Sequence, residues 1–249
     1  MNNSGLSILL QRSAVGSVLT TPSDLGALPW FIRFSLADLF AQAKYGEQVA
    51  LGCAKTLLEL ETGEDERAFA ITQARDEASH VAFFEAAERD LRVTRPVLPP
   101  LKRLLDTAAS QTDLPNVLLG THLIVETLAH DLFSDVAKRL QALGRSQWLP
   151  QRWAVAFRDV AGSMLGISRD ESRHVAFGVL RLAALRESMS AGERVQLDQL
   201  AQHWVSQLEA TLEALPVLFL LKPIKREIVR GVMLRCRQRC IDVGLEVGR

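Results

Sequence analysis

Four long stretches of this sequence place apolar residues at steps of three and four, and each of these apolar stripes also contains a glutamate. The spacing is that of one face of an α-helix. Leu, Ala, Glu, Arg and Gln, which favour helices, dominate these stretches, and β-branched runs of period two are missing. We therefore predict an all-α fold. The predicted helices are at about 35–62, 64–92, 113–143, 150–188, 191–214 and 222–245, with a short helical piece at about 101–109.

Residues that begin or end helices support these boundaries. The pair Thr62–Gly63 separates the first two predicted helices and is followed by acidic residues, which favour a helix N-terminus. Ser190 and Glu193 have the spacing of a capping box, and Pro150 suits the first turn of the fourth long helix. Two prolines within 215–223 predict a packed turn between the last two helices.

The glutamates within the four apolar stripes require a common explanation. A carboxylate among apolar neighbours is costly unless it is paired or binds a cation. Two of the four belong to a Glu-x-x-His pattern, whose residues lie side by side on a helix because they are three positions apart. One Glu from each of two helices and one Glu-x-x-His from each of two others form the ligand set of a dimetal site inside a four-helix bundle. The predicted metal ligands are Glu47, Glu77, His80, Glu126, Glu171 and His174.

The heights of these residues along their helices agree. In an antiparallel helix pair, residues at the same height are equally far from the turn, because both helices rise about 1.5 Å per residue. The ligands of the first helix pair are centred near residue 63, at the predicted break, and those of the second pair near residue 149, beside Pro150. The alternative interpretation, a set of solvated charged faces, does not require this agreement.

An aspartate precedes each Glu-x-x-His pattern. A histidine that binds a metal usually donates its second N–H to a carboxylate, which fixes its tautomer. We expect Asp76 to accept from His174 and Asp170 to accept from His80, across the helix pair. Arg173 lies three residues after Asp170 and is expected to balance its charge.

Two further histidines and the four tryptophans have less specific interpretations. His122 and His130 lie four residues before and after Glu126, so they are predicted as hydrogen-bond partners near the metals or as additional ligands. The alternative for both is a structural role, in which each histidine lies in the core and is hydrogen-bonded within the protein. The tryptophans are interpreted as packing groups rather than as an electron path; they are Trp30, Trp148, Trp153 and Trp204.

The composition argues against several other functions. Lys plus Arg and Asp plus Glu both number 29, so we expect no nucleic-acid partner and no membrane partner. No run reaches the roughly 18 apolar residues of a membrane span, and no basic segment precedes the short apolar N-terminal stretch, so a cytoplasmic location is expected. Three cysteines predict no disulfide framework, and Cys236 and Cys240 are predicted as packed thiols on one helix. For 249 residues, one domain is the simplest division.

These residues resemble the ferritin-like dimetal-carboxylate superfamily, and within it the ribonucleotide reductase small-subunit-like proteins and ligand-binding oxidases. The resemblance lies in RDEASHVAFF at 75–84, THLIVETLAHDLF at 121–133 and RDESRHVAFGVL at 169–180, together with Glu47. It implies one ferritin-like helical domain over 1–249: a four-helix bundle with a dimetal core at about 35–188, and two additional C-terminal helices at about 190–245. The motif is specific to the superfamily and not to one reaction.

Departures from the subgroups narrow the expected function. Reductase subunits usually carry a radical tyrosine at the position of Phe84, and the only tyrosine of this chain is Tyr45. Ligand-binding oxidases form a tyrosine–valine cross-link whose tyrosine position is here Thr121, so that link is excluded. N-oxygenases have a third histidine at the position of Ile167. The resemblance therefore points away from a conventional reductase subunit and from the seven-ligand N-oxygenase pattern.

We expect a dimetal oxidase or oxygenase that uses dioxygen to oxidise a small organic substrate, with an unidentified electron donor and no catalytic residue beyond the metal ligands. Two iron ions are the favoured cofactor, with Mn/Fe or Mn/Mn as alternatives. A homodimer is an expectation from the family alone. Two other hypotheses stay open: a radical-generating reductase-like accessory subunit, and a metal-storage or peroxide-protection protein. An apolar cavity at the metals would favour the oxygenase; its expected lining is Ala50, Ala129, Met164 and Ile167.

Overall fold

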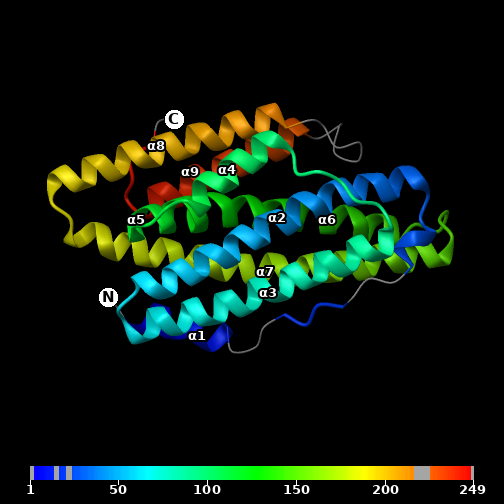
Figure 1. The fold of residues 1–249 in the computed structure, drawn as a ribbon, viewed down its shortest axis with the longest axis horizontal. Coiled ribbons are helices and arrows are strands. Elements are labelled where there is room, and N and C mark those ends of the chain that lie inside the picture. Colours follow the sequence, from blue (N-terminus) through cyan, green and yellow to red (C-terminus); the bar gives the residue numbers. More distant parts are fainter. Residues whose placement is uncertain (1–2, 14–16, 21–23, 216–224, 248–249) are drawn as a thin grey trace.

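The computed structural model describes residues 3–13, 17–20, 24–215 and 225–247. All regular elements within these ranges are helical, which confirms the all-α prediction (Figure 1). In chain order they are α1 (Asn3–Ser13), η1 (Leu25–Ala27), α2 (Trp30–Leu60), α3 (Glu64–Leu91), α4 (Pro99–Ala109), α5 (Leu114–Val117), the π-helix η2 (Leu118–Val125), α6 (Glu126–Gly144), α7 (Gln151–Ser188), α8 (Ala191–Ala214) and α9 (Lys225–Asp242).

The predicted helices are confirmed, with small differences at their ends. Helix α2 begins five residues before the predicted start, and α1 and η1 were not predicted. The capping box at the start of α8 is present, because Ser190 Oγ accepts from Glu193 N at 3.3 Å and Ser190 N donates to Glu193 Oε2 at 2.8 Å. Pro150 is the N-cap of α7. The predicted turn at 215–223 lies, beyond Leu215, outside the described residues.

Two antiparallel helix pairs form the bundle. Helix α2 packs on α3, and η2–α6 packs on α7, while α4, α8 and α9 lie along one side (Figure 1). The predicted inward stripes are buried, except for the half-buried Ala129. On α3, for example, Phe69 belongs to one apolar cluster and Phe84 to a second, with Glu77 and His80 between them. The buried acids therefore lie between two apolar clusters, as the stripes predicted.

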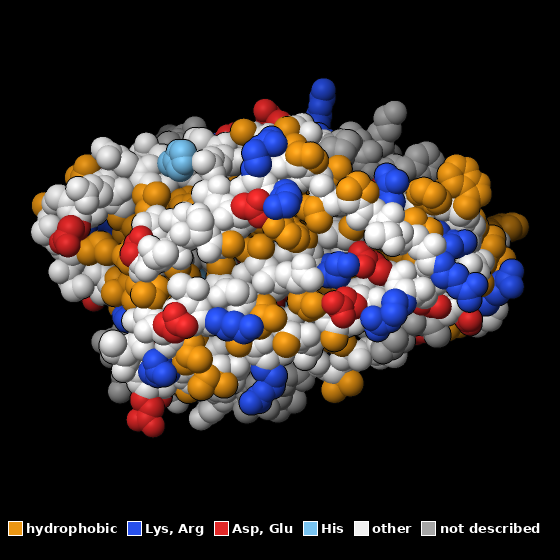
Figure 2. Space-filling model, in the orientation of Figure 1, with side chains coloured by type: hydrophobic (Ala, Val, Ile, Leu, Met, Phe, Trp, Pro, Cys, Tyr) orange, Lys and Arg blue, Asp and Glu red, His pale blue; other side chains and the backbone are white. Residues whose placement is uncertain are grey.

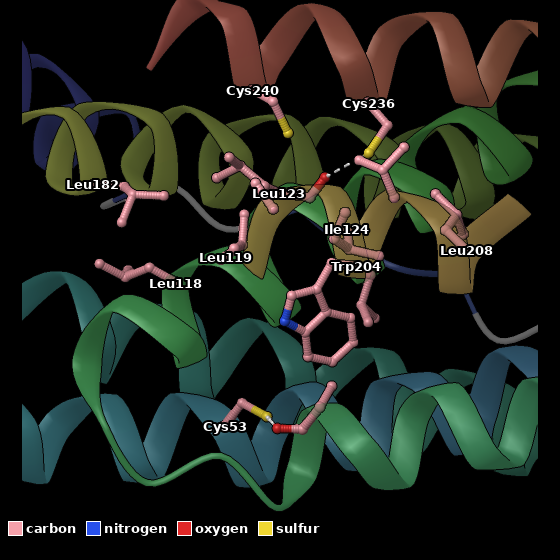
Figure 3. Packing of buried hydrophobic residues seen from close by; sticks show 14 of the residues in the cluster. Cys53, Leu118, Leu119, Leu123, Ile124, Leu182, Trp204, Leu208, Cys236 and Cys240 are labelled. Carbon is pink, nitrogen blue, oxygen red and sulfur yellow. Dashed lines mark hydrogen bonds between the residues drawn. The ribbon is translucent and has the colours of Figure 1, made fainter. Parts of the chain in front are cut away.

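The accessory helices hold the π-helix in place. Trp204 of α8 is buried against η2 so closely that a Cβ at Gly120 would lie 2.7 Å from its ring. On α9, Cys236 Sγ donates to the carbonyl oxygen of Leu123 at 3.7 Å (Figure 3). Cys236 and Cys240 are both buried and free, which confirms their prediction as packed thiols. A π-helix contains an extra residue per turn, and η2 ends directly before Glu126.

The prediction that all four tryptophans are packing groups is wrong for two of them. Trp204 is 2% exposed, whereas Trp30 is 71% and Trp148 95% exposed. The reason is their position: Trp30 is the first residue of α2, and Trp148 lies in the turn between α6 and α7, where neighbouring helices no longer cover the chain. Trp153 is half-buried, and its Nε1 donates to the carbonyl oxygen of Ala27 at 3.0 Å.

Close packing between α7 and η2 yields a stability prediction. A Cβ at Gly178 would lie 2.3 Å from His122 Cβ, so Gly178→Ala should lower the free energy of unfolding by about 1–3 kcal/mol through overpacking. The matched control is Gly162→Ala on the same helix. Apart from its chain neighbours and its own helix backbone, no atom lies within 4 Å of a Cβ there, so alanine should raise stability by about 0.5–1 kcal/mol. Chemical denaturation of both variants measures the difference, and equal effects would contradict this packing.

Candidate metal centre

The six predicted ligands converge at the centre of the bundle. Their ligand atoms form two groups, each with all its atoms within 4.8 Å of one another. Both groups share Glu77 and Glu171, which come from α3 and α7. All six residues are buried, none being more than 3% exposed. The groups are Glu47, Glu77, His80 and Glu171, and Glu77, Glu126, Glu171 and His174.

Each histidine directs Nδ1 toward the carboxylates. His80 Nδ1 lies 3.2 Å from oxygens of both Glu47 and Glu77 and 3.4 Å from Glu171 Oε1. His174 Nδ1 lies 3.0 Å from Glu77 Oε1 and 3.5 Å from Glu171 Oε2. The spacing of three residues thus places each histidine beside the glutamate of its own helix, as expected from helix geometry.

The opposite ring nitrogens face the predicted aspartates. His80 Nε2 lies 3.2 Å from Asp170 Oδ2, and His174 Nε2 lies 3.5 Å from Asp76 Oδ2. Arg173 joins the two sides, since its Nη2 lies 2.7 Å from Asp170 Oδ1 and 3.1 Å from Asp76 Oδ2. Asp170 thus lies within hydrogen-bond distance of His80, whereas the contact of Asp76 with His174 is longer and lacks hydrogen-bond geometry.

Ser17 is an additional contact that sequence reasoning missed. Its Oγ donates to Asp170 Oδ1 at 2.9 Å and to the carbonyl oxygen of Gly166 at 3.0 Å. Residues 17–20 form no helix and carry no periodic pattern, so the sequence offered no signal for this contact.

His122 reaches the centre only through Gln73. The amide of Gln73 donates to Glu126 Oε1 at 3.0 Å, and its Oε1 lies 3.1 Å from His122 Nε2. The amide oxygen can only accept, so His122 carries its proton on Nε2. Burial lowers the pKa of His122 to about 3, so this imidazole is neutral. Sequence reasoning missed Gln73 as a partner of Glu126; a polar amide one turn before Glu77 was the available signal.

His130 takes no part in this arrangement of contacts. Its Nδ1 lies 2.8 Å from the carbonyl oxygen of Ser168, and Ser168 Oγ donates to the carbonyl oxygen of His130 at 3.1 Å. These bonds tie α6 to α7. His130 is therefore a histidine whose polar groups are satisfied within the protein, which was the alternative interpretation.

The electrostatics of the cluster show why it suits cations. Burial, reinforced by the charge of Glu126, raises the pKa of Glu171 to about 8. Burial and the charge of Glu171 likewise raise the pKa of Glu47 well above its usual value. Glu77 differs: burial opposes its ionisation, but His174 and His80 outweigh it and hold its pKa well below the usual value. Without metal, the carboxylates compete for too little positive charge.

Several buried carboxylate oxygens of this cluster are not satisfied by other groups of the protein. Imidazole nitrogens approach both carboxylate oxygens of Glu171 and Oε1 of Glu77, but no group among the described residues contacts these oxygens with the geometry of a hydrogen bond. Such groups are costly unless a cation or a proton satisfies them. Four carboxylates would balance the charge of two divalent cations, and oxygen donors with two imidazoles suit iron and manganese. The residues present therefore fit a pair of divalent metal ions.

An apolar cavity of about 50 Å³ adjoins the two unshared glutamates, Glu47 and Glu126. Ala50 and Ala129 line it, as expected, whereas Met164 and Ile167 lie in the apolar core and not at this cavity. The reason is that the cavity opens between α2, α4 and α6, away from α7. The lining is Gln42, Ala43, Gly46, Glu47, Ala50, Leu101, Leu105, Val125, Glu126, Leu128, Ala129, Leu132 and Phe133.

Comparison with known proteins bears on the fold. No protein-family profile matches the chain, and no curated protein sequence matches it. Solved structures of R2-like ligand-binding oxidase variants are similar. One variant, with an anaerobically reconstituted Mn/Fe cofactor, has a TM-score of 0.70 and 16% identity over 98% of this chain and 93% of the other. Another such anaerobic structure has a TM-score of 0.65 at the same coverage and identity.

A variant of the same oxidase with an aerobically reconstituted Mn/Fe cofactor has a TM-score of 0.63 and 16% identity, over 98% of this chain and 86% of the other. At such low identity the likeness concerns the fold, and at that level it confirms the predicted resemblance. The chain has the all-helical, ferritin-like fold of the R2-like ligand-binding oxidases.

Proposed function

We propose that the chain is a non-haem dimetal oxidase or oxygenase that uses dioxygen to oxidise a small organic molecule. The observation that carries this proposal is the sharing of Glu77 and Glu171 between two ligand groups, each of which has its own histidine. A single cation would not use both groups. The solved structures with a similar fold contain an Mn/Fe cofactor according to their descriptions, which supports a metal pair in this fold.

Each ligand has a distinct role in the proposal. Glu77 and Glu171 would hold both ions, and Glu47 and His80 would complete the first site. Glu126 and His174 would complete the second. The aspartate beside each histidine would hold the imidazole in the tautomer that leaves Nδ1 free to bind metal. Gln73 orients Glu126 from the other side.

The apolar cavity favours an oxidase over a storage protein. When bound, two iron or manganese ions would supply the redox chemistry with dioxygen. The chain would supply a small apolar space beside Glu47 and Glu126, in which an apolar group of a small substrate can lie. Ala50 and Ala129 leave this space open because their side chains are short. An electron donor, so far without an assigned surface, completes the proposed cycle.

Metal content distinguishes the proposed roles of the ligands. The metal-free protein should bind two iron or manganese ions per chain, measured by elemental analysis after loading under reducing conditions. Glu171→Ala removes a shared ligand and should abolish both sites, whereas Glu47→Ala should leave about one ion per chain. Asp131→Asn is the control, since Asp131 is buried but pairs with Arg235 at 2.6 Å. Two ions bound by Glu171→Ala would contradict the bridging role.

The metal-free protein should lose stability as the pH rises from about 5 to 8. In this interval Glu171, with a pKa of about 8 instead of 4.5, keeps a proton in the folded state that the unfolded state has lost. The free energy of unfolding then falls by about 1.4 kcal/mol per pH unit for one such proton. The raised pKa of Glu47 acts in the same direction, as do those of His80 and His174 above pH 6.5. The lowered pKa of His122 acts in the opposite direction below pH 6.5 and offsets about one of these protons there. The lowered pKa of Glu77 acts only below pH 4.5.

Denaturation of metal-free protein across this pH range measures the slope, and Glu171→Gln should flatten it. Metal competes with these protons, so the stabilisation on adding metal should increase with pH. A metal-free protein that becomes more stable between pH 5 and 8 would refute the electrostatic description of the cluster.

Iron oxidation in air separates an oxidase from a storage protein. Iron uptake should stop at two ions per chain, and reduced, loaded protein should convert apolar alcohols, phenols or hydrocarbons to oxidised products that mass spectrometry detects. Ala129→Val narrows the cavity and should keep both metals but lower product formation by about tenfold. Continued iron uptake without an organic product would instead identify storage.

A further inference from the structure

One end of the bundle combines exposed aromatic and basic side chains. We define the aromatic tip as residues 24–34, 90–96 and 143–153, which include the start of α2, the end of α3 and the turn between α6 and α7. These segments meet at the right-hand end of Figure 1. Figure 2 shows hydrophobic and Lys or Arg side chains gathered at the same end.

Specific contacts join the three segments into one surface. The guanidinium of Arg33 donates to the carbonyl oxygen of Leu91 at 2.9 and 2.6 Å. The guanidinium of Arg95 lies 5.5 Å from the ring centroid of Phe34. The bond from Trp153 to Ala27, described above, connects the third segment to the first. The tip is therefore built by tertiary contacts and is not a set of independent loops.

Large apolar side chains of the tip are exposed to solvent together. Trp148 is 95%, Trp30 71%, Phe31 44% and Phe34 42% exposed. Trp30 contacts the edges of Phe31 and Phe34, with ring centroids 6.1 Å apart in both pairs. Single exposed apolar residues are normal, but clustered ones usually mark an interaction surface.

The charge of the tip is positive although the chain is balanced. The tip contains five arginines and two aspartates, a net charge of 5 − 2 = +3, and the adjacent Asp38 pairs with Arg95 at 2.5 Å, which leaves +2. The whole chain has 29 basic and 29 acidic residues. Arg145 and Arg152 are exposed. The equal numbers of basic and acidic residues, from which no membrane partner was expected, describe the chain as a whole. They do not show that arginines are in excess at this end of the bundle. The arginines are Arg33, Arg92, Arg95, Arg145 and Arg152.

We infer that the aromatic tip docks the protein on an anionic lipid bilayer. Tryptophan favours the boundary between lipid headgroups and acyl chains, because its ring is apolar and its N–H is polar. Guanidinium groups pair with lipid phosphates and carboxylates. A nucleic acid would satisfy the arginines but would leave the apolar side chains of Phe31 and Phe34 largely unburied. In the described part of the chain no helix is long and apolar enough to cross a membrane, and docking at the surface needs none.

The tip lies well away from the candidate metal centre. Glu47 follows Trp30 by 17 residues, and Gly144 follows Glu126 by 18. At about 1.5 Å per residue, the tip is on the order of 25 Å from the metal ligands. Docking through the tip therefore leaves the ligands unaltered. The inference does not depend on the proposed function.

Sedimentation with vesicles tests the inference on the full chain. The protein should bind vesicles of equimolar phosphatidylcholine and phosphatidylserine, and bind pure phosphatidylcholine vesicles about tenfold less or more weakly still. Raising the salt concentration should weaken binding to the anionic vesicles. Brominated acyl chains should quench tryptophan fluorescence, and Trp148→Phe should reduce this quenching.

Substitutions on the surface test whether the tip, rather than another surface of the protein, binds the vesicles. Trp30→Ala combined with Trp148→Ala should lower vesicle binding by about tenfold or more, because both rings leave the interface. Arg145→Gln combined with Arg152→Gln should lower binding only to anionic vesicles, also by about tenfold. Leu234→Ala and Arg230→Gln on α9 are matched controls, because both residues are exposed outside the tip. Circular dichroism verifies that the variants are folded.

Four results would overturn the inference. The first is no binding to anionic vesicles by the wild-type chain. The second is binding that the α9 controls weaken as much as the tip variants do. The third is a homodimer in light scattering that the tryptophan variants dissociate, which would assign the tip to a second copy of the chain. The fourth is binding to single-stranded DNA and to vesicles that the arginine substitutions weaken equally and the tryptophan substitutions leave unchanged, which would assign the tip to nucleic acid.

Discussion

Glu77 and Glu171 meet at the centre of the bundle with carboxylate oxygens that no hydrogen bond satisfies. Burying these groups between two apolar clusters is unfavourable unless positive charge is bound between them. The rest of the centre is arranged around this constraint. His80 and His174 direct Nδ1 toward the acids, and an aspartate faces the opposite nitrogen of each imidazole. Arg173 then balances both aspartates.

The fold provides this arrangement through register. Each helix pair turns at a point equidistant from its ligands, so the ligands from four helices reach one height. The accessory helices then stabilise the segment before Glu126, where Trp204 and Cys236 pack on the π-helix. Gln73 fixes Glu126 itself. These contacts determine where the second ligand group forms, although none of the residues that make them is a predicted ligand.

The helices and the proposed ligands were predictable because both leave a periodic signal. An acid in an apolar stripe is visible in the sequence, and repetition on four helices makes a chance pattern improbable. The contact of Gln73 with His122 was not predictable, since an amide in a stripe has many partners available. Met164 and Ile167 were expected at the cavity because they share the inward face of α7, but the side of the bundle on which a cavity opens depends on helix packing.

The exposed tryptophans show a second limit of the sequence. Trp30 and Trp204 are equally apolar, yet one begins a helix at the end of the bundle and the other lies under η2. Burial at a helix end depends on which segments meet there. Total charge has the same limit, because a sum over the chain does not show that the arginines of three distant segments lie together.

The most direct test of the metal centre is a crystal structure of metal-loaded protein with anomalous scattering measured at the iron and manganese edges. The arrangement described above predicts two adjacent anomalous peaks, both bound by Glu77 and Glu171, with one histidine beside each peak. A single peak, peaks bound by other residues, or no metal between these two glutamates would contradict the central claim.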